Sequence, residues 1–217
     1  MVKSLKILIT AGPTREYLDP VRFISNSSTG VMGYTIARTA VKRGHKVRLI
    51  SGPTAIDPPL GIRLTNVISA REMARQTIES LSWCNCLIMS AAVCDYRPKR
   101  VLTGKMNTAS LNKNVELVKN IDILKQVSKK KKHNRIIAGF ALQTDNLLKK
   151  AKAKLIAKDL DLIIANELSK KKDPFGQGLT SIMSIDRQGN IYKMNKMKKE
   201  KISVFLLDKI EQLCYNS

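Results

Sequence analysis

The feature that most constrains this chain is a repeated alternation of short apolar runs with segments of helical periodicity. The runs, rich in Ile, Leu and Val, predict strands at residues 5–10, 46–51, 63–68, 86–90, 135–138 and 160–165. The intervening patterns predict helices at residues 30–42, 70–82, 121–130 and 146–158. Such alternation is typical of an α/β fold in which a Rossmann-like, doubly wound, mostly parallel sheet is covered by helices.

The last part of the chain has a different pattern. Residues 180–185 and 191–194 flank a polar turn at 186–190, which predicts a β-hairpin, and a final helix is expected over 201–213. No internal repeat and no long linker divides the sequence, and 217 residues are enough to bury a large core. We therefore expect one domain over residues 1–217.

Composition excludes several classes of protein. No run approaches the roughly 18 uncharged apolar residues of a membrane helix, and the first residues read as a strand rather than a signal peptide, so we expect a cytoplasmic protein. The four cysteines lack the spacing of a zinc knuckle and are expected to be reduced thiols. They are Cys84, Cys86, Cys94 and Cys214. Cys94 lies inside an informative motif, but we expect it to be a small buried apolar side chain.

The net charge of +22 raises the possibility of a nucleic-acid partner. The excess is mostly lysine, in runs at 129–132, 170–172 and 196–201, and few aromatic residues lie near these runs. Base-stacking surfaces are therefore not evident. We interpret the runs as a solvated lysine-rich surface and do not expect nucleic acid as a partner, while a basic nucleic-acid-binding module stays an alternative.

A long loop at 11–29 follows the first predicted strand. Residues 27–30 (Ser-Ser-Thr-Gly) stand just before the next helix, where hydroxyl and backbone N–H groups could cradle a phosphate. Ser28 or Thr29 could equally serve only as the helix N-cap, and both interpretations stay open. Arg22 and Asn26 offer a guanidinium and an amide on the same loop, which suits a substrate carrying a carboxylate or an amide.

A second long loop, at 91–116, follows the strand predicted at 86–90. Small residues at 90–92 would let a flat ring approach the backbone, and Asp95 could accept hydrogen bonds from an exocyclic amino group or serve only as a turn residue. Both long loops follow the carboxyl ends of strands, where open α/β sheets bind ligands. The two loops are therefore expected to form one site.

Several long stretches resemble the phosphopantothenoylcysteine synthetase domain of the bacterial bifunctional coenzyme A biosynthesis proteins. They are ITAGPTREYLDPVRFISNSSTGVMGYTIA (9–37), AAVCDYRP (91–98), VKNIDIL (118–124), GFALQTD (139–145) and KLIAKDLDLIIANE (154–167). The resemblance covers nearly the whole chain, in the family's order and at about its spacings.

This resemblance implies a phosphopantothenate–cysteine ligase of coenzyme A biosynthesis. CTP would activate 4′-phosphopantothenate as an acyl-cytidylate and release pyrophosphate. The cysteine amine would then form the C–N bond of 4′-phosphopantothenoylcysteine and release CMP. The resemblance also implies Mg²⁺, whose ligands stay unknown, and a homodimer. The flavin-dependent decarboxylase half of the family is absent from this sequence, so no flavin is expected and a separate phosphopantothenoylcysteine decarboxylase becomes a candidate partner.

The resemblance also assigns roles to individual residues. Lys105 and Asn26 would serve the chemical steps, and Arg22 would join Asn26 in binding the acid substrate. The positions implied to bind the nucleotide are Met89, Ser90, Ala91, Asp95, Lys105, Asn120, Ile121, Asp122, Ile123, Phe140, Lys154 and Lys158. Lys154 and Lys158 are four residues apart, which places them on one face of the predicted helix.

An NAD(P)-dependent oxidoreductase on the same general fold is a further alternative. The glycines near the first strand fall at 12, 30 and 33, rather than in the G-x-G-x-x-G cluster of dinucleotide-binding folds. The strand predicted at 46–51 also lacks the acidic residue that binds a ribose in such enzymes. These two absences favour the ligase.

Overall fold

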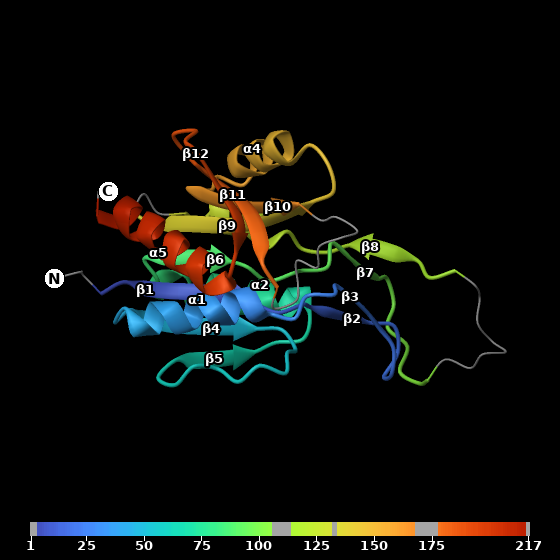
Figure 1. Cartoon of the computed structure of the whole chain (residues 1–217). Helices are drawn as coiled ribbons and strands as arrows, with labels where there is room; N and C mark the ends of the chain where they lie inside the picture. The colour runs from blue at the N-terminus through green and yellow to red at the C-terminus, as the bar shows by residue number, and fades with distance from the viewer. Residues whose placement is uncertain (1–3, 106–113, 132–133, 168–177, 216–217) are drawn as a thin grey trace.

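The computed structural model describes residues 4–105, 114–131, 134–167 and 178–215. They form a central eight-stranded sheet with helices on both faces (Figure 1). Its spatial order is β12 (Ile191–Met197), β11 (Thr180–Asp186), β10 (Leu162–Glu167), β9 (Ile136–Gln143), β6 (Cys86–Met89), β1 (Lys6–Ala11), β4 (Lys46–Ser51) and β5 (Arg63–Asn66). The strands from β10 to β5 are parallel to their neighbours, whereas β11 and β12 form an antiparallel hairpin. This confirms the predicted α/β fold and its C-terminal hairpin.

Helices cover the two faces because neighbouring side chains on a buried strand point to opposite sides. Ile7 of β1 belongs to one apolar cluster and Leu8 to the other. The first face carries α1 (Val31–Lys42) and α5 (Lys199–Tyr215). The second carries α2 (Ala70–Ser80), the short 3₁₀ helix η1 (Leu81–Trp83), α3 (Ile123–Ser128) and α4 (Leu147–Ala157).

Helices α1 and α5 run side by side in the same direction (Figure 1). Thr39 Oγ1 lies 3.2 Å from Ser203 Oγ, and four residues later Arg43 pairs with Asp208 at 2.7 Å and with Glu211 at 3.0 Å. Residues later in α1 thus contact residues later in α5, as in two parallel helices. Both helices therefore begin at the same end, the carboxyl edge of the parallel strands.

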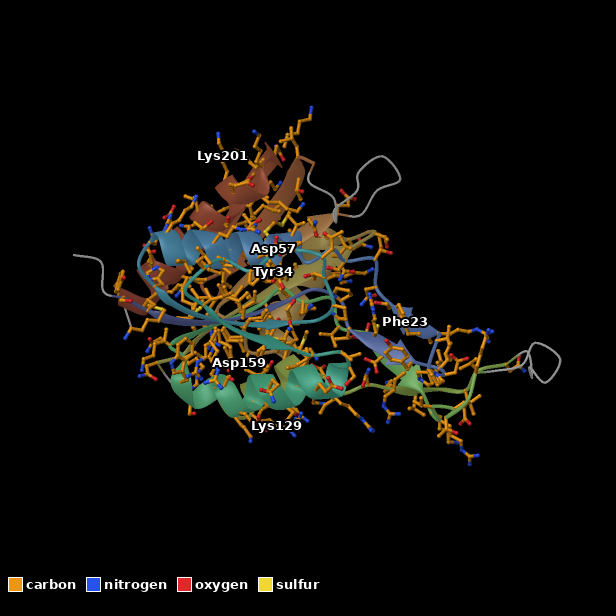
Figure 2. The ribbon with its side chains drawn as sticks, turned by 90° about the horizontal axis from the view of Figure 1, so that it is seen from below. Phe23, Tyr34, Asp57, Lys129, Asp159 and Lys201 are labelled. Carbon is orange, nitrogen blue, oxygen red and sulfur yellow. The ribbon has the colours of Figure 1, made fainter. Side chains whose placement is uncertain are left out.

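Two small antiparallel ribbons lie beyond that edge (Figure 1). One pairs β2 (Arg15–Tyr17) with β3 (Phe23–Ser25), and the other pairs β7 (Tyr96–Pro98) with β8 (Leu117–Lys119). Figure 2 shows Phe23 on this side extension, away from Tyr34 over the main sheet. The sequence predicts only loops over 11–29 and 91–116, but these ranges contain β2, β3 and β7, because strands of three residues are too short to show a clear apolar alternation.

Candidate functional site

A cavity of about 1010 Å³ lies at the carboxyl edge of the parallel strands. The ends of β6, β9 and β10 contribute Met89, Phe140 and Asn166 to it. On one face of the sheet, the start of α1 forms a wall of the cavity. On the other face, the start of α3 and the side of α4 form the opposite wall. Open α/β sheets bind ligands at this edge, so the cavity is the candidate site.

At the start of α1, glycine residues let the backbone lie close to its neighbours. Gly30 is the N-cap residue with a φ of +82°, a left-handed conformation that favours glycine, and the helix has no side-chain cap. Ser28 Oγ instead accepts a hydrogen bond from the Gly30 N–H at 3.3 Å, so the N-cap interpretation of Ser28 and Thr29 was wrong. A Cβ on Gly33 would lie only 2.6 Å from Ser90 Oγ. This first turn therefore presents backbone N–H groups to the cavity, a natural place for an anion.

Asn26 is held between this wall and the strand ends. Its Nδ2 donates to the Ala92 carbonyl oxygen at 3.0 Å, and Ser25 Oγ donates to the Thr14 carbonyl oxygen at 2.8 Å. The Cys94 N–H donates to Thr14 Oγ1 at 3.0 Å. Loop 11–29 and the segment after β6 are thus joined, and Asn26 lies on the cavity as predicted.

The segment after β6 places four more predicted residues on the cavity, namely Met89, Ser90, Ala91 and Asp95. Ser90 Oγ donates to the Thr10 carbonyl oxygen at 2.6 Å, and the Ala91 N–H donates to Thr10 Oγ1 at 3.3 Å. These hydrogen bonds fix the backbone at the position where the sequence predicts that a flat ring could bind. The exposed Asp95 carboxylate stays at the rim, while the Asp95 carbonyl oxygen accepts from the Asn120 N–H at 2.7 Å.

The opposite wall joins α3 to α4 through charge. Asp122 is the N-cap of α3, accepting from the Lys125 N–H at 2.9 Å, and it also pairs with Lys158. Burial alone would raise the pKa of Asp122, but the hydrogen bonds from Lys158 and from the Lys125 N–H hold that pKa below its ordinary value. Asp122 therefore stays ionised and keeps the Lys158 ammonium beside the cavity.

Lys154 lies one turn earlier on α4 and also lines the cavity, as the four-residue spacing predicted. Its Nζ donates to the Phe140 carbonyl oxygen at 2.7 Å. Burial lowers the pKa of Lys154, and the nearby Asp95 charge opposes that shift. Asn120 Nδ2 is buried and has no hydrogen-bond partner among the described residues. The wall thus offers two ammonium groups and a donor that lacks an acceptor, together with the lining residues Ile121, Ile123 and Phe140.

Two predicted residues lie off the cavity. Arg22, on the turn between β2 and β3, pairs with Asp19 at 3.7 Å, and Lys105 is exposed at the end of the described range 4–105. Neither is among the residues that line the cavity. The structure therefore brings twelve of the fourteen predicted site residues together and leaves these two on the side extension.

Lys199, the first residue of α5, lines the cavity and was missed by the sequence analysis. Only 4% of it is exposed. The sequence analysis assigned Lys199 to the solvated run 196–201 and began the last helix at 201. If the helix is started two residues earlier, Lys199 lies one turn before Ser203, on the buried face of α5. This helical spacing is the signal that could have identified Lys199.

The other lysine run that the structure describes is also not wholly solvated. The Lys131 side chain is only 10% exposed and pairs with Asp161 at 2.8 Å. All four cysteines are free, and Cys94 is buried as expected. Burial raises the pKa of the Cys84 thiol to about 11, so it is an inert apolar side chain at neutral pH. The described residues contain no group of three or more His, Cys, Asp or Glu side chains that could hold a metal ion.

None of the helices in the described ranges is both long and apolar enough to cross a membrane. The longest, α5, alternates buried and exposed residues along its length and packs against α1.

Comparisons with known proteins agree with this architecture. Residues 2–214 match the family described as the DNA/pantothenate metabolism flavoprotein C-terminal domain. The coenzyme A biosynthesis bifunctional protein CoaBC of Borreliella burgdorferi is 38% identical over 208 residues, which are 95% of this chain and 52% of that protein. The CoaBC protein of Bacillus subtilis is 39% identical over 208 residues, 95% of this chain and 51% of that protein. The chain thus spans about half the length of these curated relatives.

Among solved structures, the C-terminal domain of a CoaBC protein superposes with a TM-score of 0.85 at 35% identity. The match covers 100% of this chain and 98% of that chain, so it includes the hairpin and α5 as well as the parallel strands. The resemblance found in the sequence is therefore confirmed. The chain belongs to the family of DNA/pantothenate metabolism flavoprotein C-terminal domains, the C-terminal part of the bifunctional coenzyme A biosynthesis proteins.

Proposed function

We propose that this chain is a phosphopantothenate–cysteine ligase that uses CTP. The single observation that carries the proposal is the cavity at the sheet edge, whose two walls carry separate sites for anions. One wall presents the first turn of α1 and residues 27–30, and the other presents Lys154 and Lys158. A ligase that joins a phosphorylated acid to an amine at the expense of a triphosphate needs two such sites.

The first step makes a leaving group. A carboxylate oxygen of 4′-phosphopantothenate attacks the α-phosphorus of CTP, the bond to the β-phosphate oxygen breaks, and pyrophosphate leaves. Asn26 is placed to donate to the acid, because its Nδ2 is fixed at the cavity by the Ala92 carbonyl oxygen. Lys154 and Lys158 hold the phosphates as fixed positive charges, which stabilise the charge that builds on them.

The second step forms the amide bond. The cysteine nitrogen attacks the acyl carbon, the bond to the CMP oxygen breaks, and the amine gives up a proton. Ser90 and Ala91 hold the backbone beside the base, and Asp95 accepts from its exocyclic amino group. Asn120 Nδ2, buried without an acceptor among the described residues, is a further donor for the nucleotide.

Mg²⁺ accompanies a triphosphate in such reactions and supplies further positive charge to its oxygens. The cavity carries the carboxylates Asp95 and Asp122, and Asp122 already pairs with Lys158. The described residues hold no cluster of three metal ligands. This donor set fits a Mg²⁺ that would be held mainly by phosphate oxygens and water rather than by a cluster of carboxylates.

Lys105 and Arg22 are proposed to complete the site although neither lines the cavity. Lys105 would approach the α-phosphate on its loop, and Arg22 would bind the acid. We propose that the chain acts as a homodimer, because the side extension that carries both residues exposes apolar side chains to water. The exposed apolar residues there are Val21, Phe23, Tyr96, Val101, Leu102, Val115 and Leu117. Such a patch typically marks an interface.

Light scattering at micromolar protein and moderate salt checks the homodimer. The expected mass is twice the 24.2 kDa of the chain. A mass of one chain across that range of concentration contradicts the dimer.

The proposed reaction takes place in the cytoplasm, where the four free thiols stay reduced. Its product would pass to a phosphopantothenoylcysteine decarboxylase. The second point is supported by the relatives, which are bifunctional proteins of coenzyme A biosynthesis about twice as long as this chain.

An end-point assay tests the ligase directly. Wild-type protein with 4′-phosphopantothenate, cysteine, Mg²⁺ and CTP should release equal amounts of pyrophosphate and CMP. Parallel reactions with ATP, and reactions without cysteine or without the acid, define the substrates. No pyrophosphate with any triphosphate, from protein that unfolds cooperatively on heating, contradicts the proposal.

A further inference from the structure

Lys199 is a charged side chain in the cavity to which the proposed mechanism gives no task. It is the first residue of α5, only 4% of it is exposed, and its Nζ donates to Thr180 Oγ1 at 3.4 Å. Thr180 and Ile182 of β11 line the cavity beside it. Lys199 is therefore a buried lysine of the cavity lining whose Nζ lies beside another lining residue, Thr180. In such a low-dielectric setting, an ammonium attracts an anion more strongly than it would in water.

The packing of α5 against α1 locates Lys199. Ser203 Oγ is 3.2 Å from Thr39 Oγ1, and the two helices run in the same direction. Going back four residues along both helices, about 6 Å at the usual rise, brings Lys199 level with Thr35. Thr35 Oγ1 donates to the carbonyl oxygen of Val31, the first residue of α1. Lys199 therefore lies within about one turn of the end of α1 that faces residues 27–30.

Lys199 and the lysines of α4 lie on opposite faces of the sheet. Ala151 and Leu155 of α4 belong to the apolar cluster of the second face. Ile202 and Leu206 of α5 belong to the cluster of the first face, which also contains α1. The carboxyl edge of the sheet thus separates two positive regions of one cavity. This separation suits two anionic substrates that would repel each other at one place.

We propose that Lys199 binds the phosphate group of 4′-phosphopantothenate and selects this acid over unphosphorylated pantothenate. The inference rests on the proposed function and adds a substrate-binding residue to it. The phosphate would lie at the starts of α1 and α5, where both helix dipoles present their positive ends, with the hydroxyls of Ser27 and Ser28 beside it. Lys154 and Lys158 would stay with the triphosphate on the other side of the edge.

The assignment is tested by comparing wild type and a Lys199 variant, each with the phosphorylated and the unphosphorylated acid. Lys199→Met removes the charge and keeps most of the buried stem. It should lower kcat/KM for 4′-phosphopantothenate by about 10- to 100-fold, the usual value of a charge-assisted hydrogen bond. It should leave kcat/KM for pantothenate and KM for CTP within about twofold, because neither involves the lost interaction. Lys199→Arg, which keeps the charge, should recover part of the loss.

Lys201→Met is the matched control, since Lys201 is an exposed lysine on the same helix (Figure 2). It should behave as wild type with both acids. Thermal unfolding of each variant checks the fold, and Lys199→Gln repeats the test should the methionine variant unfold. Equal losses with the two acids, a rise in KM for CTP instead, or no change at all would each overturn the inference.

Calorimetric titration of 4′-phosphopantothenate into wild type and Lys199→Met reads the same interaction without turnover. Weaker binding by the variant, with pantothenate binding unchanged, supports the inference. Equal binding of 4′-phosphopantothenate by the two proteins refutes it. A wild-type protein that binds the acid through Lys199 but releases no pyrophosphate would refute the ligase reaction alone, so the two failures are distinguishable.

Discussion

The walls of the cavity and the side extension contribute to the proposed site in different ways. Met89, Phe140 and Lys154 lie on β6, β9 and α4, elements that pack into the two apolar clusters, and the Lys154 Nζ donates to the Phe140 carbonyl oxygen. Arg22 and Lys105 lie on short ribbons and loops at one side of the sheet, half-buried or exposed (Figure 1). The core thus fixes the residues proposed to bind the nucleotide, but not the groups proposed to act at the reacting phosphate.

This difference separates binding from chemistry. A residue held by the core can bind a ligand at full strength from the start, because little further ordering is needed. Arg22 and Lys105 lie outside the cavity lining, so in the proposed mechanism they contribute only once they reach the reacting groups. We expect substitutions in the two regions to change different kinetic constants.

Lys105→Gln should have the largest effect. Residues 106–108 hold no lysine, so no neighbouring charge replaces it. Losing one donor that acts on a developing phosphoryl charge typically lowers the rate by about 10²- to 10³-fold. KM for CTP should change much less, because Lys154 and Lys158 remain. Rapid-quench measurements of pyrophosphate and CMP release check this.

Lys99→Gln is the control on the same loop. Lys99 is exposed, pairs with Glu116 at 2.6 Å, and does not line the cavity. It should behave as wild type. Near-normal release of both products by Lys105→Gln would remove Lys105 from the chemistry. A raised KM with unchanged kcat would move it to the binding region and erase the contrast.

Lys158→Met should have a smaller effect, and on KM rather than on kcat. It should raise KM for CTP about tenfold, the value of one charge-assisted contact, and leave kcat nearly unchanged. Lys152→Met, on the exposed side of α4, is the control and should have no effect. Steady-state kinetics with CTP varied at saturating acid and cysteine measure both. A fall in kcat without a change in KM would show that a core-held lysine also acts in the chemistry.

The sequence predicts the core-held region better than the extension. The strand at Lys46–Ser51 was predicted to the residue, because Val47, Leu49 and Ile50 form a short apolar segment of the kind that buried strands show. Strand β9 was predicted to end at 138 but continues to Gln143, through Gly139, where the apolar pattern is interrupted. The ribbons were missed because their strands are only three residues long and show no extended apolar run.

Site residues show the same limit. Most of the motif residues line one cavity, because their segments follow the carboxyl ends of neighbouring strands. Lys199 could not be found from composition, since its neighbours Lys198 and Lys201 are exposed and only the register of α5 distinguishes it. Arg22 and Lys105 show that motif membership does not place a side chain in the cavity. Their position depends on the geometry of loops, which has no strong local signal.

The smallest expected effect concerns pH and again separates the two regions. Burial holds the pKa of Lys154 below its ordinary value of 10.5, with the Asp95 charge opposing the shift. Lys154 therefore loses its proton at a lower pH than an exposed lysine. KM for CTP should rise as the pH increases through this lowered pKa, because only the ammonium attracts phosphate. In the same window the unfolded chain binds more protons than the folded one, so this group makes the free protein more stable as the pH rises.

Lys154→Arg is the test, because an arginine stays charged over the whole range. The variant should bind CTP somewhat less well at neutral pH, since a planar guanidinium replaces a compact ammonium, but its KM should vary less between pH 7 and pH 10. Lys152→Arg, on the exposed side of the same helix, should keep the pH dependence of wild type. Identical pH profiles for wild type and Lys154→Arg would mean that Lys154 does not touch the triphosphate. Its hydrogen bond to the Phe140 carbonyl oxygen would then be a purely structural contact between α4 and β9.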